Sequence, residues 1–380
     1  MVMASPSPSP EARPERRDFL KAADTVAAAG LGLAGSTNAR GVGPFVHTDA
    51  KAETQPPILG EGAHRFEVTH GWGQLPDSIR WGETHGVAID PDGFVYIKHR
   101  STEAEPIDAI VVFDRQGRYV RSFGREFHGG GHGIDMRSES GQTFLYLCDM
   151  TRGLVVKTDL KGEVVWRRAA PPECPVYENP TARFVPTNVA FAPDGNLLVA
   201  DGYGSNLIHR YNAEGVHLGW FGGTGTEPGQ FRTPHGLWVD QRPGRVAVGG
   251  QEGPVLVVAD RANARLQWFT LEGEPLAVGE NLVSFPAHFD IDAQGDLMVV
   301  PDLHARVTLM DRSNRVVTHL GDDPEWTKTV LDGFKVRRQP ETWREGRFVH
   351  PHDACFDRDG NLFVVEWVSV GRVSFLRKLA

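Results

Sequence analysis

Histidine recurs at the start of short apolar runs along this chain. In FVHPHDACFDRDG, at 348–360, His352 and Asp353 stand directly before a run that is typical of a β-strand. A further version of this pattern, PTNVAFAPDG, has Asn188 where the others have histidine. Neutral imidazole is a common metal ligand, so these histidines are candidate ligands, yet their repetition first requires an architectural explanation. The other four copies are THGVAID, GHGIDM, PHGLWVD and PAHFDID, with His85, His132, His235 and His288.

The spacing of these strand starts predicts a repeat. Successive positions from His85 to His352 are 47, 56, 47, 53 and 64 residues apart, and periods of this size are typical of propellers and solenoids. Within the first unit, the segments HGVAID, FVYIKH, AIVVFD and YVRSFG are separated by turns such as PDG and RQG and by one longer loop. Period-2 alternation between such turns favours β-strands. Each unit is therefore predicted to be a four-stranded antiparallel meander.

The last unit lacks one strand. HDACFDRDG, NLFVVEWV and GRVSFLRKL supply three strands, while HRFEVTHGW at 64–72 precedes the first unit without a partner. A strand taken from the other end of the chain closes the ring and removes exposed sheet edges. We therefore predict an all-β, six-bladed β-propeller over residues 60–380, with an insertion at 322–349 between the fifth and sixth blades.

A closed ring brings the first strand of every blade to the central channel. Alternate blades of six are about 120° apart in such a ring, so His132, His235 and His352, from blades two, four and six, converge with threefold geometry. Three neutral imidazoles with one open position form a typical catalytic zinc site. Any one of these histidines alone is better explained as a spacer that bonds the backbone at the channel mouth. In the other three blades a spacer or a substrate contact is the interpretation, and their residues are His85, Asn188 and His288.

Strand direction places two more side chains on the same face. The second strand of each blade returns to the face where the first begins, so the loop that follows also lies there. Arg100, in YIKHRS, and Tyr203, in VADGYGSN, occupy such loops. Alone, Arg100 is explained as a solvated loop charge and Tyr203 as a rim aromatic. Their presence on one face with three histidines favours a functional site.

The composition limits the partners. A formal charge of −9 leaves no broad basic surface, so nucleic acid is not an expected partner. No window holds the roughly 20 uncharged apolar residues that span a bilayer, so the mature protein is not expected to associate with a membrane. Three cysteines allow at most one intramolecular disulfide, and we expect buried thiols without an assigned bond.

Residues 1–40 differ from the rest of the chain. The order Arg16-Arg17-Asp18-Phe19-Leu20-Lys21, followed by a short apolar stretch, resembles a twin-arginine export signal. The alternative is a disordered basic leader. The signal predicts a periplasmic or secreted protein, with residues 41–59 as a linker to the propeller.

Several motifs resemble a known family. VVADRANARLQWF at 257–269 matches the pattern of NHL-repeat propellers. Within that group the chain resembles the peptidyl-α-hydroxyglycine α-amidating lyases over most of residues 84–380, and best over 186–239. Position by position, the resemblance implies zinc on His132, His235 and His352, a catalytic base at Tyr203 and a substrate-binding Arg100. It also implies a structural calcium, held by the carboxylate of Asp353 and the backbone carbonyls of Val87 and Ile134.

Other positions depart from the family pattern. The two disulfides of the animal lyases fall on Val185 with Gly204 and on Val257 with Trp268, so neither can form. The loop STEAEPID after Arg100 is shorter than the family's, which changes the substrate entrance. No counterpart is assigned to His85, His288 or the 322–349 insertion.

The resemblance implies a zinc-dependent lyase. Such an enzyme cleaves the C–N bond of an α-hydroxyglycine, giving an amide and glyoxylate, so the expected partner is a small-molecule or peptide substrate with a carboxylate. Two alternatives remain open at this stage. One is another metal-dependent propeller hydrolase of the lactonase type, and the other is a non-catalytic NHL-repeat propeller that binds a partner on the same face.

Overall fold

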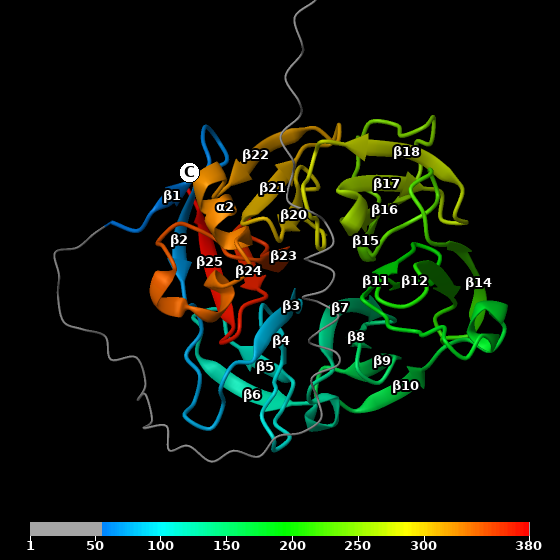
Figure 1. Ribbon diagram of the computed structural model, residues 1–380, viewed down its shortest axis with the longest axis horizontal. Helices are drawn as coiled ribbons and strands as arrows, with labels where there is room; N and C mark the ends of the chain where they lie inside the picture. Colours follow the sequence, from blue (N-terminus) through cyan, green and yellow to red (C-terminus); the bar gives the residue numbers. More distant parts are fainter. Residues whose placement is uncertain (1–54, 380) are drawn as a thin grey trace, which may run out of the picture. The chain divides into compact units, whose positions relative to one another are not determined.

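The computed structural model describes residues 55–379, which form a wheel of six β-sheets around a central axis (Figure 1). The predicted six-bladed propeller is confirmed. The export signal expected at 1–40 and most of the linker expected at 41–59 lie outside the described residues. The first strand of the wheel is β1, at Ile58–Leu59.

Each of the first five blades is a four-stranded antiparallel meander. Blade 1 contains β3 (Glu83–Ile89), β4 (Val95–Arg100), β5 (Ile110–Phe113) and β6 (Tyr119–Phe123). Blade 2 contains β7 (Gly131–Glu139), β8 (Gln142–Asp149), β9 (Leu154–Asp159) and β10 (Val164–Arg168). Blade 3 contains β11 (Asn188–Phe191), β12 (Leu197–Asp201), β13 (Leu207–Tyr211) and β14 (His217–Gly222).

The remaining blades continue this order around the wheel. Blade 4 contains β15 (Pro234–Asp240), β16 (Val255–Asp260), β17 (Arg265–Phe269) and β18 (Pro275–Glu280). Blade 5 contains β19 (Asp290–Ile291), β20 (Met298–Asp302), β21 (Arg306–Met310) and β22 (Val316–Leu320). Blade 6 contains β23 (Pro351–Phe356), β24 (Leu362–Glu366) and β25 (Arg372–Lys378), followed by β2 (Phe66–His70) and β1.

The ring closes through the N-terminal strand, as predicted. Strand β2 pairs antiparallel with β25, with Val68 opposite Leu376. Strand β1 then pairs with β2 and gives this sheet a fifth strand that the repeat did not predict. Joining the two ends of the wheel in one sheet leaves no gap between the first and last blades.

The core lies between neighbouring blades. Alternate residues of a strand point to opposite faces of its sheet, and β16 shows the result. Leu256 and Val258 pack toward blade 3, whereas Val255 and Val257 pack toward blade 5. Both faces of an inner strand are therefore buried, which is why its sequence is a continuous apolar run.

The insertion at 322–349 folds onto the sixth blade. It contains helix α2 (Pro324–Leu331) and the 3-10 turns η4 (Val336–Arg338) and η5 (Pro340–Thr342). The carboxylate of Asp323 caps α2 by accepting the backbone N–H groups of Glu325 and Trp326. The indole of Trp326 is buried and donates to the carbonyl of Phe348, 2.6 Å away. Other 3-10 turns are η1 (Arg125–Phe127), η2 (Pro175–Glu178) and η3 (Arg261–Asn263).

The expectation for the cysteines is confirmed, since Cys148, Cys174 and Cys355 are all buried free thiols. Within residues 55–379, no helix is both long enough and apolar enough to span one.

Candidate metal centre

The histidines proposed as metal ligands lie in β-bulges at the start of inner strands. Pairing shifts by one residue around His132 in β7, His235 in β15 and His352 in β23. A bulge locally changes the direction of a side chain, which in regular pairing would point to one of the two faces of the sheet. Blade 1 has the same bulge at His85, whereas blade 3 pairs regularly from Asn188 onward. Blade 5 shows the same shift around His288, between the bridge of Pro286 with Asp302 and the pair Asp290 with Val299. A bulge therefore accompanies each of the five strand-start histidines, and it does not by itself decide which of them meet at the axis.

His132, His235 and His352 form a nearly equilateral triangle. Their ring centroids are 4.7, 4.8 and 4.9 Å apart, and the planes of the rings are steeply inclined to one another. The Nε2 atoms of His132 and His235 are 3.1 Å apart. Two nitrogens that share a tetrahedral zinc ion, at about 2.0–2.1 Å each, are separated by roughly 3.3 Å. The alternate-blade geometry expected from the ring is thus what the structure contains.

Backbone carbonyls fix the orientation of all three rings. The Nδ1–H of His132 donates to Thr187 O at 2.6 Å, that of His235 to Ala287 O at 2.7 Å, and that of His352 to His85 O at 2.7 Å. This bond places the ring proton on Nδ1 and leaves the lone pair on Nε2. Two unprotonated nitrogens facing each other at 3.1 Å repel unless a cation lies between them. The donor set therefore fits a metal ion such as zinc.

The glycines after His132 and His235 permit these bonds. A Cβ atom at Gly133 would lie 2.5 Å from Thr187 O, and one at Gly236 would lie 2.4 Å from Ala287 O. These are the carbonyls that accept the Nδ1–H groups of the two histidines. The His-Gly pattern in the sequence thus reflects the close approach of the next blade's backbone.

Burial keeps the three imidazoles neutral. Each is at most 4% exposed. Loss of solvent lowers the pKa of His132, His235 and His352 well below the usual histidine value, and nearby positive charges lower it further. Neutral imidazole is the form that binds a metal, so metal binding requires no proton release at neutral pH.

Tyr203 lies against this triangle. Its hydroxyl is 3.1 Å from Nε2 of His235 and 3.4 Å from Nε2 of His132. The predicted proximity of Tyr203 to the histidines is therefore present. Arg261 donates to the same hydroxyl at 3.1 Å, and its guanidinium carbon lies 5.0 Å from the centre of the tyrosine ring.

Sequence reasoning missed Arg261. It is only 3% exposed, and it begins turn η3 directly after β16. The signal was the arginine of VVADRANARLQWF, which follows a second strand in the same way as Tyr203 does. Its position after β16 predicts the same face as the histidines.

Arg100 is the last residue of strand β4 in blade 1, the blade that also carries His85. Its Nη1 lies 3.5 Å from Oε2 of Glu83, a long contact. Oε1 of Glu83 also accepts a 2.5 Å bond from Arg337, which belongs to the insertion. Burial favours the neutral carboxyl of Glu83, but the hydrogen bond from His85 and the nearby positive charges prevail and lower its pKa to about 2. Glu83 is therefore an ionised link between Arg100, Arg337 and His85.

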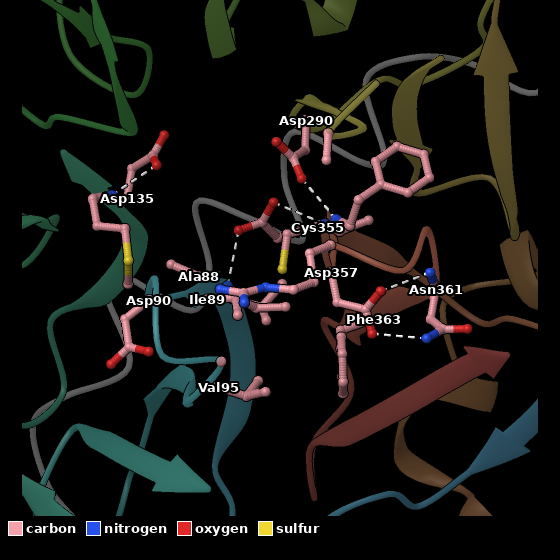
Figure 2. A pocket seen from close by; sticks show the side chains of 18 of the residues that line it. Ala88, Ile89, Asp90, Val95, Asp135, Asp290, Cys355, Asp357, Asn361 and Phe363 are labelled. Atoms are coloured by element: carbon pink, nitrogen blue, oxygen red, sulfur yellow. Dashed lines mark hydrogen bonds between the residues drawn. The ribbon is translucent and has the colours of Figure 1, made fainter. Parts of the chain in front are cut away.

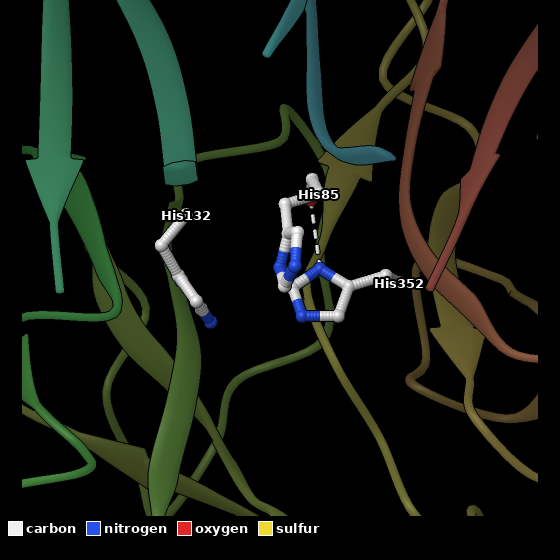
Figure 3. A group of neighbouring side chains, drawn as sticks. All are labelled: His85, His132 and His352. Atoms are coloured by element: carbon white, nitrogen blue, oxygen red, sulfur yellow. Dashed lines mark hydrogen bonds between the residues drawn. The ribbon is translucent and has the colours of Figure 1, made fainter. Parts of the chain in front are cut away.

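His85 joins the central group, whereas Asn188 and His288 do not. One ring nitrogen from each of His85, His132 and His352 lies within 4.8 Å of the others. Figure 3 shows the ring of His85 edge-on between those of His132 and His352. The amide of Asn188 instead donates to Nδ1 of His288 at 2.9 Å, and His288 lines a separate chamber.

That chamber has a volume of about 680 Å³, and none of the four central histidines lines it. Asp353, Val87 and Ile134, the positions implied for calcium, all line this chamber, and Asp135 and Asp290 add two carboxyl groups (Figure 2). One oxygen of Asp353 accepts the backbone N–H of Val87 at 3.0 Å. The three positions that the resemblance implies for calcium therefore lie at one cavity. The sequence analysis did not identify Asp135 or Asp290 as neighbours of these positions.

The imidazole that lies near the chamber carboxyls does not offset their charge. Nε2 of His288 is 3.9 Å from Oδ1 of Asp353, but burial lowers the pKa of His288 to about 3, so the ring is neutral. Burial raises the pKa of Asp135 to about 8, that of Asp290 to about 7, and that of Asp353 well above the usual value. Oδ2 of Asp135 is buried and has no hydrogen-bond partner within residues 55–379. A cation supplies the missing charge most directly, and carboxylate and carbonyl oxygens are the ligands that calcium prefers.

Comparison with known proteins supports the resemblance. No protein-family model matches the chain. NHL repeat-containing protein 3 of Mus musculus is 25% identical over 249 residues, which are 63% of this chain and 67% of that protein. A probable peptidyl-α-hydroxyglycine α-amidating lyase of Caenorhabditis elegans is 24% identical over 210 residues, 50% of this chain. Peptidyl-glycine α-amidating monooxygenase B of Xenopus laevis is 26% identical over 241 residues, 56% of this chain.

The chain thus resembles NHL-repeat proteins and amidating lyases at low identity. The match spans only 56% of the nematode protein and 25% of the frog protein. Among solved structures, a gluconolactonase from Xanthomonas campestris has a TM-score of 0.52 at 13% identity and covers 89% of this chain and 99% of its own. Virginiamycin B lyase from Staphylococcus aureus has a TM-score of 0.51 at 11% identity, covering 83% of this chain and all of its own. At these identities the structural likeness shows the propeller fold alone.

Proposed function

We propose that the protein is a zinc-dependent lyase that cleaves the C–N bond of an α-hydroxyglycine, giving an amide and glyoxylate. One observation carries this proposal: the Nε2 atoms of His132 and His235 and the hydroxyl of Tyr203 lie within 3.1–3.4 Å of one another, with the ring of His352 completing the triangle. Three imidazoles beside a phenol provide a metal site with an acid–base group at its open side. The resemblance to an amidating lyase supports the same reaction.

Each residue has a role in R–CO–NH–CH(OH)–COO⁻ cleavage. A zinc ion, when bound to the three imidazoles, supplies a Lewis acid for the hydroxyl oxygen. Tyr203 accepts the hydroxyl proton, while Arg261 donates to the tyrosine oxygen and stabilises negative charge there. As the carbinol oxygen becomes the carbonyl of glyoxylate, the C–N electron pair leaves with nitrogen, which takes from Tyr203 the proton that the hydroxyl lost and so completes the amide. Arg100 binds the carboxylate, because a guanidinium can form two parallel bonds to it.

The test is glyoxylate release from α-hydroxyhippurate by zinc-loaded protein. Tyr203→Phe should keep its zinc and lose about 10²–10⁴-fold in kcat, the usual contribution of a general base. Arg100→Ala should mainly raise KM. Tyr119→Phe, an exposed tyrosine on β6, is the matched control and should leave turnover unchanged. Failure of the unaltered protein to release glyoxylate, or full activity of both site variants, would overturn the proposal.

Metal analysis separates the alternatives. Zinc near one equivalent supports the lyase, calcium alone supports a hydrolase of the lactonase type, and the absence of both supports a binding propeller.

We also propose that calcium occupies the chamber, held by Asp353 with the carbonyls of Val87 and Ile134 and with Asp135 and Asp290 nearby. This role is structural, because the chamber is separate from the imidazoles.

The proposed partner is a small molecule or peptide that carries a carboxylate.

We propose in addition that residues 1–40 direct export by the twin-arginine route to the periplasm or the medium. The paired Arg16 and Arg17 support this. Replacing both by lysine should retain the protein in the cytoplasm, and unchanged fractionation would contradict the assignment.

A further inference from the structure

His85 is a buried imidazole at the centre that the roles above leave unused. It is 4% exposed, and its ring centroid lies 4.5 Å from that of His352 and 5.3 Å from that of His132. Its own carbonyl orients His352. Its side chain is thus held against the metal ligands from blade 1, the blade that also supplies Arg100.

One nitrogen of His85 has a partner and the other has none. Nε2 lies 3.4 Å from Oε2 of Glu83. Nδ1 is buried, and the described residues offer it no hydrogen-bond partner. Because Glu83 is an ionised acceptor, the ring proton belongs on Nε2, and Nδ1 is left as an unpaired acceptor. A buried acceptor without a donor costs free energy, so a donor supplied by a ligand is favoured there.

The position of His85 suits contact with a ligand better than direct metal binding. The ring triangle is complete without it, and the pair His132 and His235 already has the close 3.1 Å nitrogen spacing of shared ligation. The ring of His85 lies 5.3 Å from that of His132, whereas the three rings of the triangle are 4.7–4.9 Å apart. A side chain that hydrogen-bonds to a zinc-bound molecule is farther from the ion than a ligand is. Its distance exceeds a metal–ligand bond by roughly the length of one hydrogen bond, about 2.8–3.0 Å.

The expected substrate has two hydrogen-bond donors near the reacting carbon: the hydroxyl, whose proton Tyr203 takes, and the amide N–H. Building on the proposed function, we propose that His85 accepts a hydrogen bond from this amide N–H and thereby selects N-acyl α-hydroxyglycines over analogues that lack the N–H. Glu83 is a positioning residue that fixes the tautomer of His85. Arg337 positions Glu83, which connects the insertion to substrate choice.

The experiment compares two ligands that this lyase chemistry does not cleave, because both lack the α-hydroxyl. Hippurate carries the amide N–H, and O-benzoylglycolate has an ester oxygen in its place. Binding to zinc-loaded protein is measured by calorimetry, together with the zinc content of every variant. The unaltered protein should bind hippurate about tenfold more tightly, because the ester leaves Nδ1 unpaired.

His85→Ala should keep its zinc and bring the ratio of the two affinities close to one. His85→Gln, which can present an acceptor oxygen, should restore part of the preference and also serves if the alanine variant does not fold. Glu83→Gln should lower the ratio without loss of zinc, and His319→Ala, on outer strand β22, should leave it unchanged.

Three results would overturn the proposal. The first is an equal affinity of the unaltered protein for both ligands, and the second is a preference that survives in His85→Ala. The third is loss of zinc from His85→Ala, which would make His85 a fourth metal ligand. None of these results bears on glyoxylate release by the unaltered protein, so failure of this inference and failure of the proposed function are distinguishable.

Discussion

At the scale of single residues, the site depends on two glycines, Gly133 and Gly236, where the next blade's backbone is too close for a larger side chain. Thr187 O accepts the Nδ1–H of His132 and lies only 2.5 Å from the position that a Cβ of residue 133 would take. We therefore predict that Gly133→Ala moves this carbonyl, misorients His132 and weakens zinc binding. It should also destabilise the fold by roughly 1–3 kcal/mol, as overpacking does.

The measurement is a zinc titration together with urea unfolding of the metal-free protein. Gly253→Ala is the matched control, because only the flexible end of Gln251 lies near its Cβ position. If zinc affinity is the same in Gly133→Ala as in the control, the link between carbonyl and ligand orientation is wrong.

At the scale of elements, the insertion is joined to blade 1 by one buried ion pair. Arg337 donates to Glu83 at 2.5 Å and lies 3.5 Å from the centre of the Trp367 ring, and its side chain is 4% exposed. Removing one partner of a buried pair leaves the other charge uncompensated. Arg337→Ala should therefore destabilise the protein by about 3 kcal/mol. This is near the low end of the roughly 3–5 kcal/mol that breaking a buried ion pair costs, because Arg100 and His85 still contact Glu83.

A double-variant cycle with Glu83→Ala checks this prediction by chemical unfolding. The combined variant should be less destabilised than the sum of the two single variants. Arg338→Ala, its exposed neighbour, should change little. Strict additivity of the two single variants would show that the pair does not hold the insertion.

The repeat and the ring were predictable because they depend on local patterns. Strand starts, turns and the unpaired segment at 64–72 are visible in the sequence, and closure then places alternate histidines together. The bulges, strand β1 and the contact of Arg261 with Tyr203 were not predicted. A bulge is a one-residue shift in the pairing of two strands, which the alternation of residue types does not reveal, and Arg261 of blade 4 contacts Tyr203 of the neighbouring blade 3. Such contacts between distant segments have no local signature.

At the scale of the whole molecule, the central imidazoles and the chamber carboxyls form two separate groups of buried titratable side chains. Burial raises the pKa of Asp290 from 3.8 to about 7, so the folded protein holds a proton there that the unfolded chain releases above pH 4. Without a cation, Asp290 therefore costs stability increasingly as the pH rises from about 4 to about 7.

Asp290→Asn removes this titration. In chelator, the variant should differ little from the unaltered protein near pH 4, become the more stable of the two as the pH rises, and level off above about pH 7. Added calcium should reduce the difference. Unfolding by urea across this pH range measures it, and a difference independent of pH would contradict the assignment of a strained buried carboxyl.

The central claim is that imidazoles from alternate blades hold one metal ion. Its most direct test is the zinc content of protein purified without chelator, measured for the unaltered chain and for His132→Ala, His235→Ala and His352→Ala, with His319→Ala as the control. We predict about one zinc per chain in the unaltered protein and in the control, and little in any of the three variants. Zinc that persists in all three, or that is absent from the unaltered protein after reconstitution, would contradict the account.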